Sequence, residues 1–368
     1  MGRSRASYAG SLLATPARAN NTAAASPPEW RHTLAFGGRE TRESLVFPTR
    51  AGAPPTSKRG VPPVIAPLRK AVFPVAGLGV RLLPATRAIP KEMLMVVDRP
   101  IIDYVVDEAR AAGIEHFILV TGRNKAVIED YFDMPVELEQ ALTGKGPEKA
   151  KVLERMRRDL LPPGQMSFTR QQQPLGLGHA VWCARELVGD EPFAVLLPDM
   201  LMAGEPGCLA QMVAAYHEVG GNMLAVEECD PARTDQYGIV GVGETVGKAF
   251  RITSMIEKPK PADAPSNLFI NGRYILQPDI FALLGEHRRG VGNEIQLTDA
   301  MIALAAKQPF YGFRYHGRTY DCGSKAGLVQ ANVALALGRS DIAPAVADEM
   351  RNLLTRYGSR EDEVPRPA

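Results

Sequence analysis

Two glycines and two cations that lie close together in the sequence could bind a polyphosphate. Gly77 and Gly79 follow a short apolar run, Arg81 comes two residues later, and Lys91 comes ten residues after that. Glycines allow a tight turn whose N–H groups approach phosphate oxygens closely. The segment is neither of two common nucleotide motifs, because Leu82 stands where a dinucleotide-binding loop has its third glycine and no G-x-x-x-x-G-K-[ST] run is present. On these residues alone, a plain Gly-rich turn is an equal alternative.

Carboxylates at the ends of two other apolar stretches could hold a metal ion. Asp199 ends the run Leu196–Pro198, and Asp321 follows Tyr320. In open α/β sheets the carboxyl ends of strands line the ligand crevice. A lone Asp there suits Mg²⁺, which keeps most of its waters and takes phosphate oxygens as ligands. An Asp in a turn or at a helix N-cap is the structural alternative.

Two further places could recognise a flat ring and a hydroxylated ligand. Gln171 precedes a glycine turn that begins at Gly176 and would let a ring approach closely, and its amide can donate to and accept from a base edge. His179, three residues after Gly176, is either a residue at a helix start close to the ligand or a packing histidine, and we favour packing over a catalytic role. Glu257 and Lys258 end another predicted strand and pair a hydroxyl-binding carboxylate with a cation, although this dipeptide is common on surfaces.

The elements that would position these side chains alternate between strand and helix. Apolar runs predict strands at 71–75, 117–121, 166–170, 193–197, 223–226, 238–242, 251–256, 269–275 and 310–315. Helical periodicity predicts helices at 101–112, from about 125, at 148–160, 178–187, 298–307 and 324–337. In the helix at 148–160, Leu153, Met156 and Leu160 would face inward. This alternation implies an α/β fold with a mostly parallel central sheet flanked by helices.

Composition narrows the class of protein and its partners. Hydrophobic residues make up 45% of the 368-residue chain and charged residues 23%, as in soluble globular proteins. Residues 1–70 hold 11 Lys and Arg against 3 acidic residues, which leaves 32 against 38 for the remainder. That mildly acidic remainder argues against nucleic acid as a partner. The four cysteines form no C-x-x-C pair, which favours a reducing, cytoplasmic location without a zinc site. No apolar run reaches the 18 or so residues that span a membrane.

Three segments are expected along the chain. Residues 1–66 are rich in Ala, Arg, Pro, Ser and Thr without periodicity, and are predicted to be disordered. An organelle transit peptide, a dispensable tail and a start codon placed too far upstream are alternative interpretations of this segment. Residues 67–338 form the predicted folded domain. Residues 339–368 are a charged tail with at most one short helix.

Taken together, these motifs resemble the sugar-phosphate nucleotidyltransferase family. The resemblance covers roughly residues 71–338. Its carriers are Gly-Leu-Gly-x-Arg at 77–81, Pro-Lys-Glu-Met-Leu at 90–94, Leu-Pro-Asp at 197–199, Tyr-Gly at 237–238, Glu-Lys-Pro at 257–259, Pro-Ser-Asn-Leu at 265–268 and Asp-Cys-Gly at 321–323. The runs GLGHAV at 176–181 and EIQLTDA at 294–300 are typical of the uridylyl branch of the family. Val80 departs from the pattern, which usually has Thr there, and so does Met95, where Pro is usual.

This resemblance implies a fold, a reaction and a set of roles. The fold would be a Rossmann-like, glycosyltransferase-A-like nucleotidyltransferase domain. The reaction would pass a uridylyl group from UTP to glucose 1-phosphate with Mg²⁺ as cofactor, in a homodimer or homotetramer. The implied roles are catalysis by Arg81, Lys91, Asp199 and Lys258; nucleotide binding by Ala76, Gly77, Leu78, Gly79, Gln171 and Gly176; sugar-phosphate binding by Gly238, Glu257, Lys258 and Asn267; and metal binding by Asp199 and Asp321. Alternatives are a relative that uses another nucleotide or sugar, and a non-catalytic nucleotide-sugar sensor.

Overall fold

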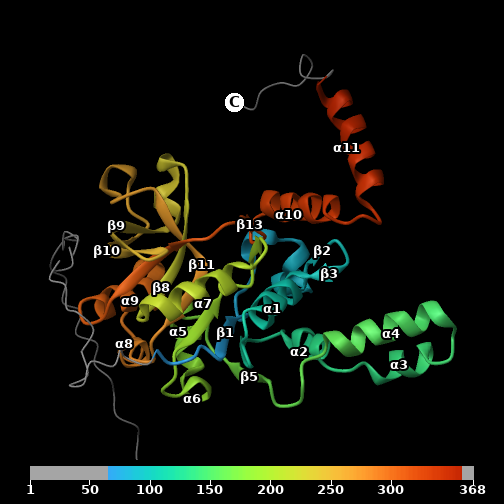
Figure 1. The fold of residues 1–368 in the computed structure, drawn as a ribbon, viewed down its shortest axis with the longest axis horizontal. Coiled ribbons are helices and arrows are strands. Elements are labelled where there is room, and N and C mark those ends of the chain that lie inside the picture. The colour runs from blue at the N-terminus through green and yellow to red at the C-terminus, as the bar shows by residue number, and fades with distance from the viewer. Residues whose placement is uncertain (1–64, 359–368) are drawn as a thin grey trace, which may run out of the picture. The chain divides into compact units, whose positions relative to one another are not determined.

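A nine-stranded sheet organises residues 65–358, the part of the chain that the computed structural model describes (Figure 1). Its strand order is β5-β4-β1-β6-β11-β8-β12-β10-β9. The strands are β1 (Lys70–Pro74), β4 (His116–Thr121), β5 (Met166–Arg170), β6 (Phe193–Leu196), β8 (Asn222–Glu228), β9 (Gly238–Val246), β10 (Ala249–Glu257), β11 (Leu268–Leu276) and β12 (Phe310–Arg314). The pairings make β10 and β11 run against the other strands of this sheet. The α/β fold with a mostly parallel sheet is therefore confirmed.

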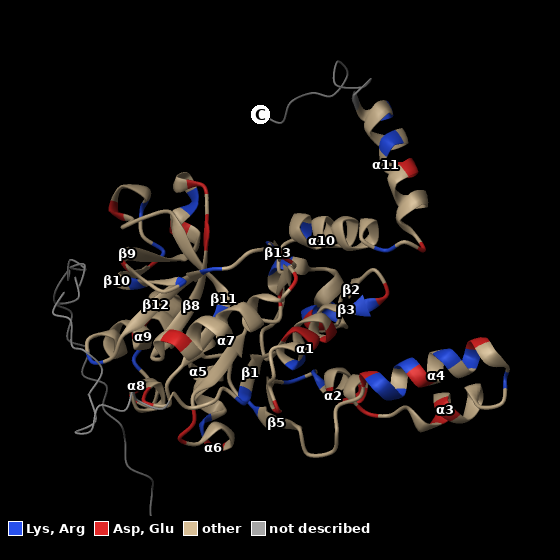
Figure 2. Cartoon of the chain, viewed as in Figure 1, with Lys and Arg blue, Asp and Glu red and all other residues tan. Residues whose placement is uncertain are grey.

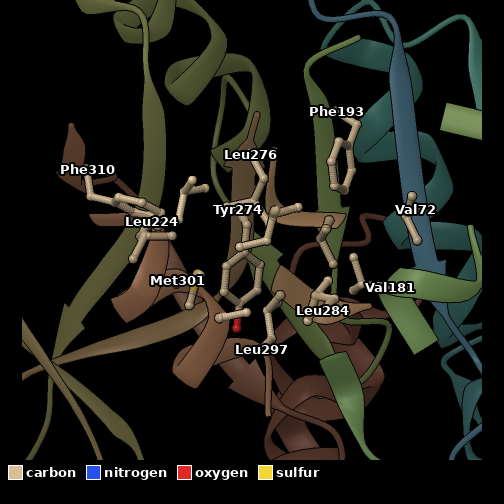
Figure 3. Close-up of a cluster of buried hydrophobic side chains, with 14 of the residues drawn as sticks. Val72, Val181, Phe193, Leu224, Tyr274, Leu276, Leu284, Leu297, Met301 and Phe310 are labelled. Carbon is tan, nitrogen blue, oxygen red and sulfur yellow. The ribbon is translucent and has the colours of Figure 1, made fainter. Parts of the chain in front are cut away.

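Helices cover both faces of the sheet because its strands are apolar on both sides. Along β1, Val72 packs into one core cluster, whereas Ala71 and Phe73 pack into the other, and all three are fully buried. Such strands appear in sequence as continuous apolar runs. The first cluster is covered by α5 (Leu177–Cys183), α6 (Arg185–Val188), α8 (Ile280–Leu284) and α9 (Leu297–Ala305); the second is covered by α1 (Ile101–Ala111), α2 (Ala126–Phe132) and α7 (Cys208–Val219). Figure 3 shows part of the first cluster around Tyr274 and Met301.

Two small ribbons lie outside the main sheet. One pairs β2 (Met95–Val96) with β3 (Arg99–Pro100), and the other pairs β7 (Met200–Ala203) with β13 (Arg318–Asp321). Short 3-10 turns occur at Val80–Leu82, Ala85–Arg87, Lys91–Met93, Pro231–Gln236, Pro261–Asp263 and Val291–Asn293. In the second ribbon Asp321 pairs with Met200. This register brings the end of β13 to the turn that contains Asp199.

Most predicted helices are present, with three differences. The helix predicted at 178–187 is divided at Ala184 into α5 and α6. The sequence patterns missed α7, α8 and also α3 (Val136–Leu142), which precedes α4 (Pro147–Asp159). In α4, Leu153 is buried as predicted, and Met156 is half-buried. After α10 (Lys325–Leu337), α11 (Ala343–Gly358) is 16 residues long, so the prediction of at most one short helix there was wrong. Figure 2 shows that α4 carries charges of both signs, whereas α10 carries few.

The sequence predicts that residues 1–66 are disordered, and residues 1–64 of this segment lie outside the described residues. Ile65 and Ala66 pack against the folded domain: a Cβ on Gly220 would lie 3.6 Å from Ile65 Cγ1, and the Tyr216 hydroxyl donates to the Ala66 carbonyl over 3.2 Å. The domain boundary after residue 66 stays a prediction. Within residues 65–358, no helix is both long enough and apolar enough to cross a membrane.

Candidate active site

The loop after β1 places its two glycines against Lys91. Gly79 has a φ of 68°, in the left-handed region that favours glycine, and its carbonyl accepts a hydrogen bond from the Thr86 hydroxyl over 2.8 Å. A Cβ on Gly77 would lie 3.5 Å from Lys91 Cε, and one on Gly79 would lie 3.2 Å from Lys91 Cβ. The structure therefore brings the predicted phosphate loop and Lys91 together, although ten residues separate Lys91 from Arg81 in sequence.

Lys91 forms a short ion pair with Asp199 at the carboxyl end of β6. The Lys91 Nζ and Asp199 Oδ2 atoms are 2.6 Å apart, and both side chains are mostly buried. Burial disfavours either charge alone, but their attraction prevails: the pKa of Lys91 is raised above its usual value, and the pKa of Asp199 is lowered. Arg81 approaches the same carboxylate, with Nη2 3.7 Å from Asp199 Oδ2. Asp199 is therefore a permanent anion held between two cations at neutral pH.

The second predicted carboxylate, Asp321, lies beside the first. Arg81 spans the two, because its Nη1 is 3.4 Å from Asp321 Oδ2. Both carboxylates also converge on Gly323, where an added Cβ would lie 2.7 Å from Asp199 Oδ2, 2.9 Å from Asp321 Oδ1 and 2.5 Å from Arg81 Nη2, the cation that neutralises them in this structure. Two carboxylate oxygens around one point fit Mg²⁺, which completes its shell with water and phosphate oxygens. Within residues 65–358, no cluster of three or more His, Cys, Asp or Glu forms a protein-only metal site.

A buried arginine that the sequence reasoning missed holds the Asp199 turn in place. Arg273 of β11 is fully buried and pairs with Glu108 of α1, with Nη2 and Oε2 2.7 Å apart. The same guanidinium donates to the carbonyls of Leu197, over 3.1 Å, and Met200, over 2.8 Å, which flank the turn on both sides. A charged residue inside the apolar strand 268–276 is the sequence signal that could have revealed it.

Gln171, the residue predicted to bind a base, comes directly after β5. Its amide Nε2 donates to the Gly176 carbonyl over 3.0 Å and lies 3.1 Å from Nδ1 of His179. The predicted nucleotide residues Gln171 and Gly176 are therefore in direct contact. His179 packs as predicted, with its ring stacked on Trp182 at 5.9 Å between centroids. The His179 ring also contacts the side-chain amide of Gln171, the residue predicted to bind the base.

The glycine turn before α5 fits against a segment more than 100 residues away. The amide of Ile295 donates to the Leu175 carbonyl over 2.7 Å, and the Gly178 amide donates to the Ile295 carbonyl over 2.9 Å. A Cβ on either Gly176 or Gly178 would lie 2.8 Å from the Ile295 carbonyl oxygen. The small size of these glycines thus admits the backbone at 294–296, and the approach of a flat ring to the same turn stays a prediction.

The predicted sugar-phosphate residues mostly line one cavity of about 250 Å³. Gly238, Glu257 and Lys258 all face it, with Thr298 and Tyr274 beside them. Glu257 Oε2 accepts a hydrogen bond from the Thr298 hydroxyl over 2.8 Å, and its Oε1 lies 3.7 Å from Lys258 Nζ. A carboxylate, a hydroxyl and an amine around a small cavity suit a phosphorylated, hydroxyl-rich ligand.

Two residues change the predicted composition of this cavity. Asn267 does not line it, and its carbonyl instead accepts a hydrogen bond from the Cys229 amide over 2.9 Å. Tyr274, which the sequence reasoning missed, lines it from β11, and Figure 3 shows its hydroxyl at the free end of the ring. Burial raises the pKa of Tyr274, with the charges of Glu257 and Asp199 adding to the effect. Tyr274 therefore contributes a neutral hydroxyl group to the lining of this cavity.

Comparisons with known proteins agree with this arrangement. The sequence matches the model of the nucleotidyl transferase family over residues 70–337. A UTP–glucose-1-phosphate uridylyltransferase from Komagataeibacter xylinus is 48% identical over 262 residues, which are 71% of this chain and 92% of the relative. One from Bacillus subtilis is 42% identical over 289 residues, which are 78% and 98% of the two chains.

Solved structures give the same result. A UTP-bound UGPase from Acinetobacter baumannii is 42% identical and superposes with a TM-score of 0.70, over 78% of this chain and 99% of its own. A UDP-glucose pyrophosphorylase complexed with UDP-glucose is 40% identical with a TM-score of 0.67, over 74% of this chain and all of its own.

Proposed function

This chain belongs to the nucleotidyl transferase family, and we propose that it is a UTP–glucose-1-phosphate uridylyltransferase, which converts UTP and glucose 1-phosphate to UDP-glucose and pyrophosphate. Relatives of that name are more than 40% identical to it over more than 90% of their own length. The observation that carries the proposal is the convergence of Lys91, Arg81, Asp199 and Asp321 beside the glycine loop.

This reaction requires the protein mainly to position the two substrates and to neutralise the charge of the leaving group. A phosphate oxygen of glucose 1-phosphate attacks the α-phosphorus of UTP, and the bond from that phosphorus to the pyrophosphate oxygen breaks on the opposite side. No covalent enzyme intermediate is needed, so in-line placement and neutralisation of the leaving group lower the barrier. Lys91, Arg81 and the N–H groups of residues 76–79 hold the triphosphate and stabilise the departing pyrophosphate. Each such preorganised charge is worth on the order of 10²–10³ in rate.

The attacking sugar phosphate is held on the other side. Lys258 binds its phosphate, and Glu257 accepts hydrogen bonds from the sugar hydroxyls. Thr298 supports this role, because its hydrogen bond occupies one carboxylate oxygen of Glu257 and so fixes the orientation of the other. Gly238 pairs with Glu257 across β9 and β10, so its backbone lies at the same cavity. Asn267 stays a sequence-based prediction.

Asp199 and Asp321 fit Mg²⁺, as their convergence near Gly323 indicates. When bound there, Mg²⁺ would supply positive charge that neutralises phosphate oxygens. Arg273 contributes by holding the turn on which Asp199 lies. Gln171 and Gly176 bind the uracil edge.

Two further proposals concern the state of the protein. We propose a cytoplasmic location, which the four unpaired cysteines support. We also propose a homodimer or homotetramer. Apolar side chains exposed on α10 and α11 support self-association, among them Val329 at 62% exposure and Leu354 at 65%. Light scattering behind size-exclusion chromatography measures this directly, and a monomeric mass would contradict it.

One assay separates this function from its alternatives. The purified chain is incubated with Mg²⁺, one nucleoside triphosphate at a time, and glucose 1-phosphate or galactose 1-phosphate, and released pyrophosphate is measured. Release with UTP and glucose 1-phosphate only supports the proposed function. Faster release with another nucleotide or sugar favours the alternative transferase. No release with any pair would leave a nucleotide-sugar sensor as the better interpretation.

A further inference from the structure

Two acceptors, the Gly176 carbonyl and Nδ1 of His179, lie beside the side-chain amide nitrogen of Gln171. The atom that contacts the Gly176 carbonyl oxygen over 3.0 Å must be the amide nitrogen, because a backbone carbonyl only accepts hydrogen bonds. With Nε2 placed there, its other hydrogen faces Nδ1 of His179, 3.1 Å away. Nδ1 must then be the acceptor, so His179 is a neutral imidazole that carries its proton on Nε2.

The surroundings of His179 favour this neutral tautomer. The residue is 9% exposed, and its ring contacts those of Trp182 and His287 at 5.9 and 5.7 Å between centroids. Cys183 contributes a thiol 3.9 Å from Nδ1. Burial lowers the pKa of His179. The neighbouring His287 and Arg289 side chains lower this pKa further, because positive charge near the ring disfavours its protonated form. At neutral pH the ring therefore presents a lone pair to Gln171.

This arrangement determines what Gln171 can offer to a base. Both of its amide hydrogens are used, by Gly176 and His179, and its Oε1 accepts from no donor among residues 65–358. An acceptor without a protein donor matches the N3–H group of uracil. Cytosine has an unprotonated N3 at the same place, so two acceptors would face each other without a proton between them.

We propose that His179 is a positioning residue that holds the Gln171 amide with its oxygen toward the base, and thereby makes the site prefer uracil over cytosine. The proposal rests on the proposed function, since it concerns how that site selects UTP. His179 touches no reacting atom. It acts through Gln171, and its loss would leave the amide with only the Gly176 carbonyl to orient it.

Two substitutions separate the acceptor of His179 from its ring. His179→Asn places a side-chain oxygen close to the position of Nδ1 but removes the ring that packs on Trp182. His179→Phe keeps a planar ring in that packing but removes the acceptor. If the acceptor positions Gln171, the ratio of kcat/KM for UTP to that for CTP stays within about threefold of wild type in the Asn variant, and falls about tenfold or more in the Phe variant.

A purely structural role predicts the reverse order, with the Phe variant close to wild type and the Asn variant impaired. That order would overturn the proposal, and so would an unchanged UTP-to-CTP ratio in the Phe variant. If the Phe variant does not fold, the Asn variant alone decides, because loss of its preference for UTP would also refute the role of the acceptor.

Calorimetric titration with UTP and with CTP, in the absence of sugar phosphate, gives the same comparison without turnover. A wild-type chain that binds UTP in preference to CTP but releases no pyrophosphate would sink the proposed function and leave this inference standing. An active wild-type chain whose Phe variant keeps its full preference for UTP would sink the inference alone.

Discussion

A methyl group added at Gly323 tests the metal and cation cluster at its narrowest point. In Gly323→Ala the new Cβ would lie 2.5 Å from Arg81 Nη2, 2.7 Å from Asp199 Oδ2 and 2.9 Å from Asp321 Oδ1. Ordinary contacts of a Cβ begin near 3.4 Å, so these three groups must each retreat by roughly 0.5 to 0.9 Å. Arg81 is 65% exposed and can move, but Asp199 is held by its 2.6 Å bond to Lys91.

The expected cost falls on turnover rather than on folding. A misplacement of about 1 Å in a reacting geometry can cost about 10²-fold in rate, which corresponds to about 2.7 kcal/mol. The clashing atoms are all tips of polar side chains, and the φ of Gly323 lies outside the left-handed region, so alanine fits its backbone. We therefore expect the free energy of unfolding to stay within about 1 kcal/mol of wild type.

Gly338→Ala is the matched control, because Gly338 has a φ of −78° and its added Cβ would meet nothing closer than 3.4 Å. Pyrophosphate release is measured for both variants across a range of Mg²⁺ concentrations, with urea unfolding in parallel. The Gly323 variant should lose turnover and require more Mg²⁺, whereas the control should match wild type. A Gly323→Ala chain with wild-type turnover and wild-type Mg²⁺ dependence would refute the assignment of both carboxylates.

Four more predictions follow from the same contacts. Lys91→Met removes a cation from the leaving group and should lower kcat by about 10²–10³, whereas turnover within fivefold of wild type would refute its role. Thr298→Val removes the hydrogen bond to Glu257 and should raise KM for glucose 1-phosphate about fivefold at unchanged KM for UTP, and Thr298→Ser should restore it. Arg273→Met leaves Glu108 buried without its partner and should lower the free energy of unfolding by about 3–5 kcal/mol in urea titrations; a loss below 1 kcal/mol would contradict that. The lowered pKa of Asp199 means that its ion pair stabilises the fold above about pH 4 and that this stability is lost as the pH falls further. The difference in unfolding free energy between wild type and Asp199→Asn should therefore be constant from about pH 5 to 8 and shrink below pH 4, and a constant gap at pH 3 would contradict the pairing.

Local patterns were sufficient for the strands of the main sheet and for most of the longer helices. Each core strand of the parallel half is an apolar run, because both of its faces are covered, and such runs are visible in sequence. Gln171 follows β5, a half-exposed edge strand, whereas Gly77 and Asp199 each follow one of these buried runs. Since the carboxyl ends of parallel strands meet at one edge, their placement together could be predicted without coordinates.

The short elements were not predictable in the same way. The ribbon of β7 and β13 has only four residues in each strand, which is too short for a periodic pattern. Its register nevertheless decides that Asp321 lies at the Asp199 turn. Sequence reasoning could name Asp321 as a candidate ligand, but not its distance from Asp199.

The sequence by itself determined the α/β class, the phosphate loop with its two cations, and the side chains that could bind base, sugar and metal. Only the tertiary structure decided how those side chains are oriented. Arg273, on another strand, donates hydrogen bonds to the Asp199 turn, and the Gly176 carbonyl and His179 both contact the amide nitrogen of Gln171. The reason is physical: residue type and strand position are local properties, whereas a hydrogen bond has a direction that depends on which distant donor or acceptor the fold brings within about 3 Å.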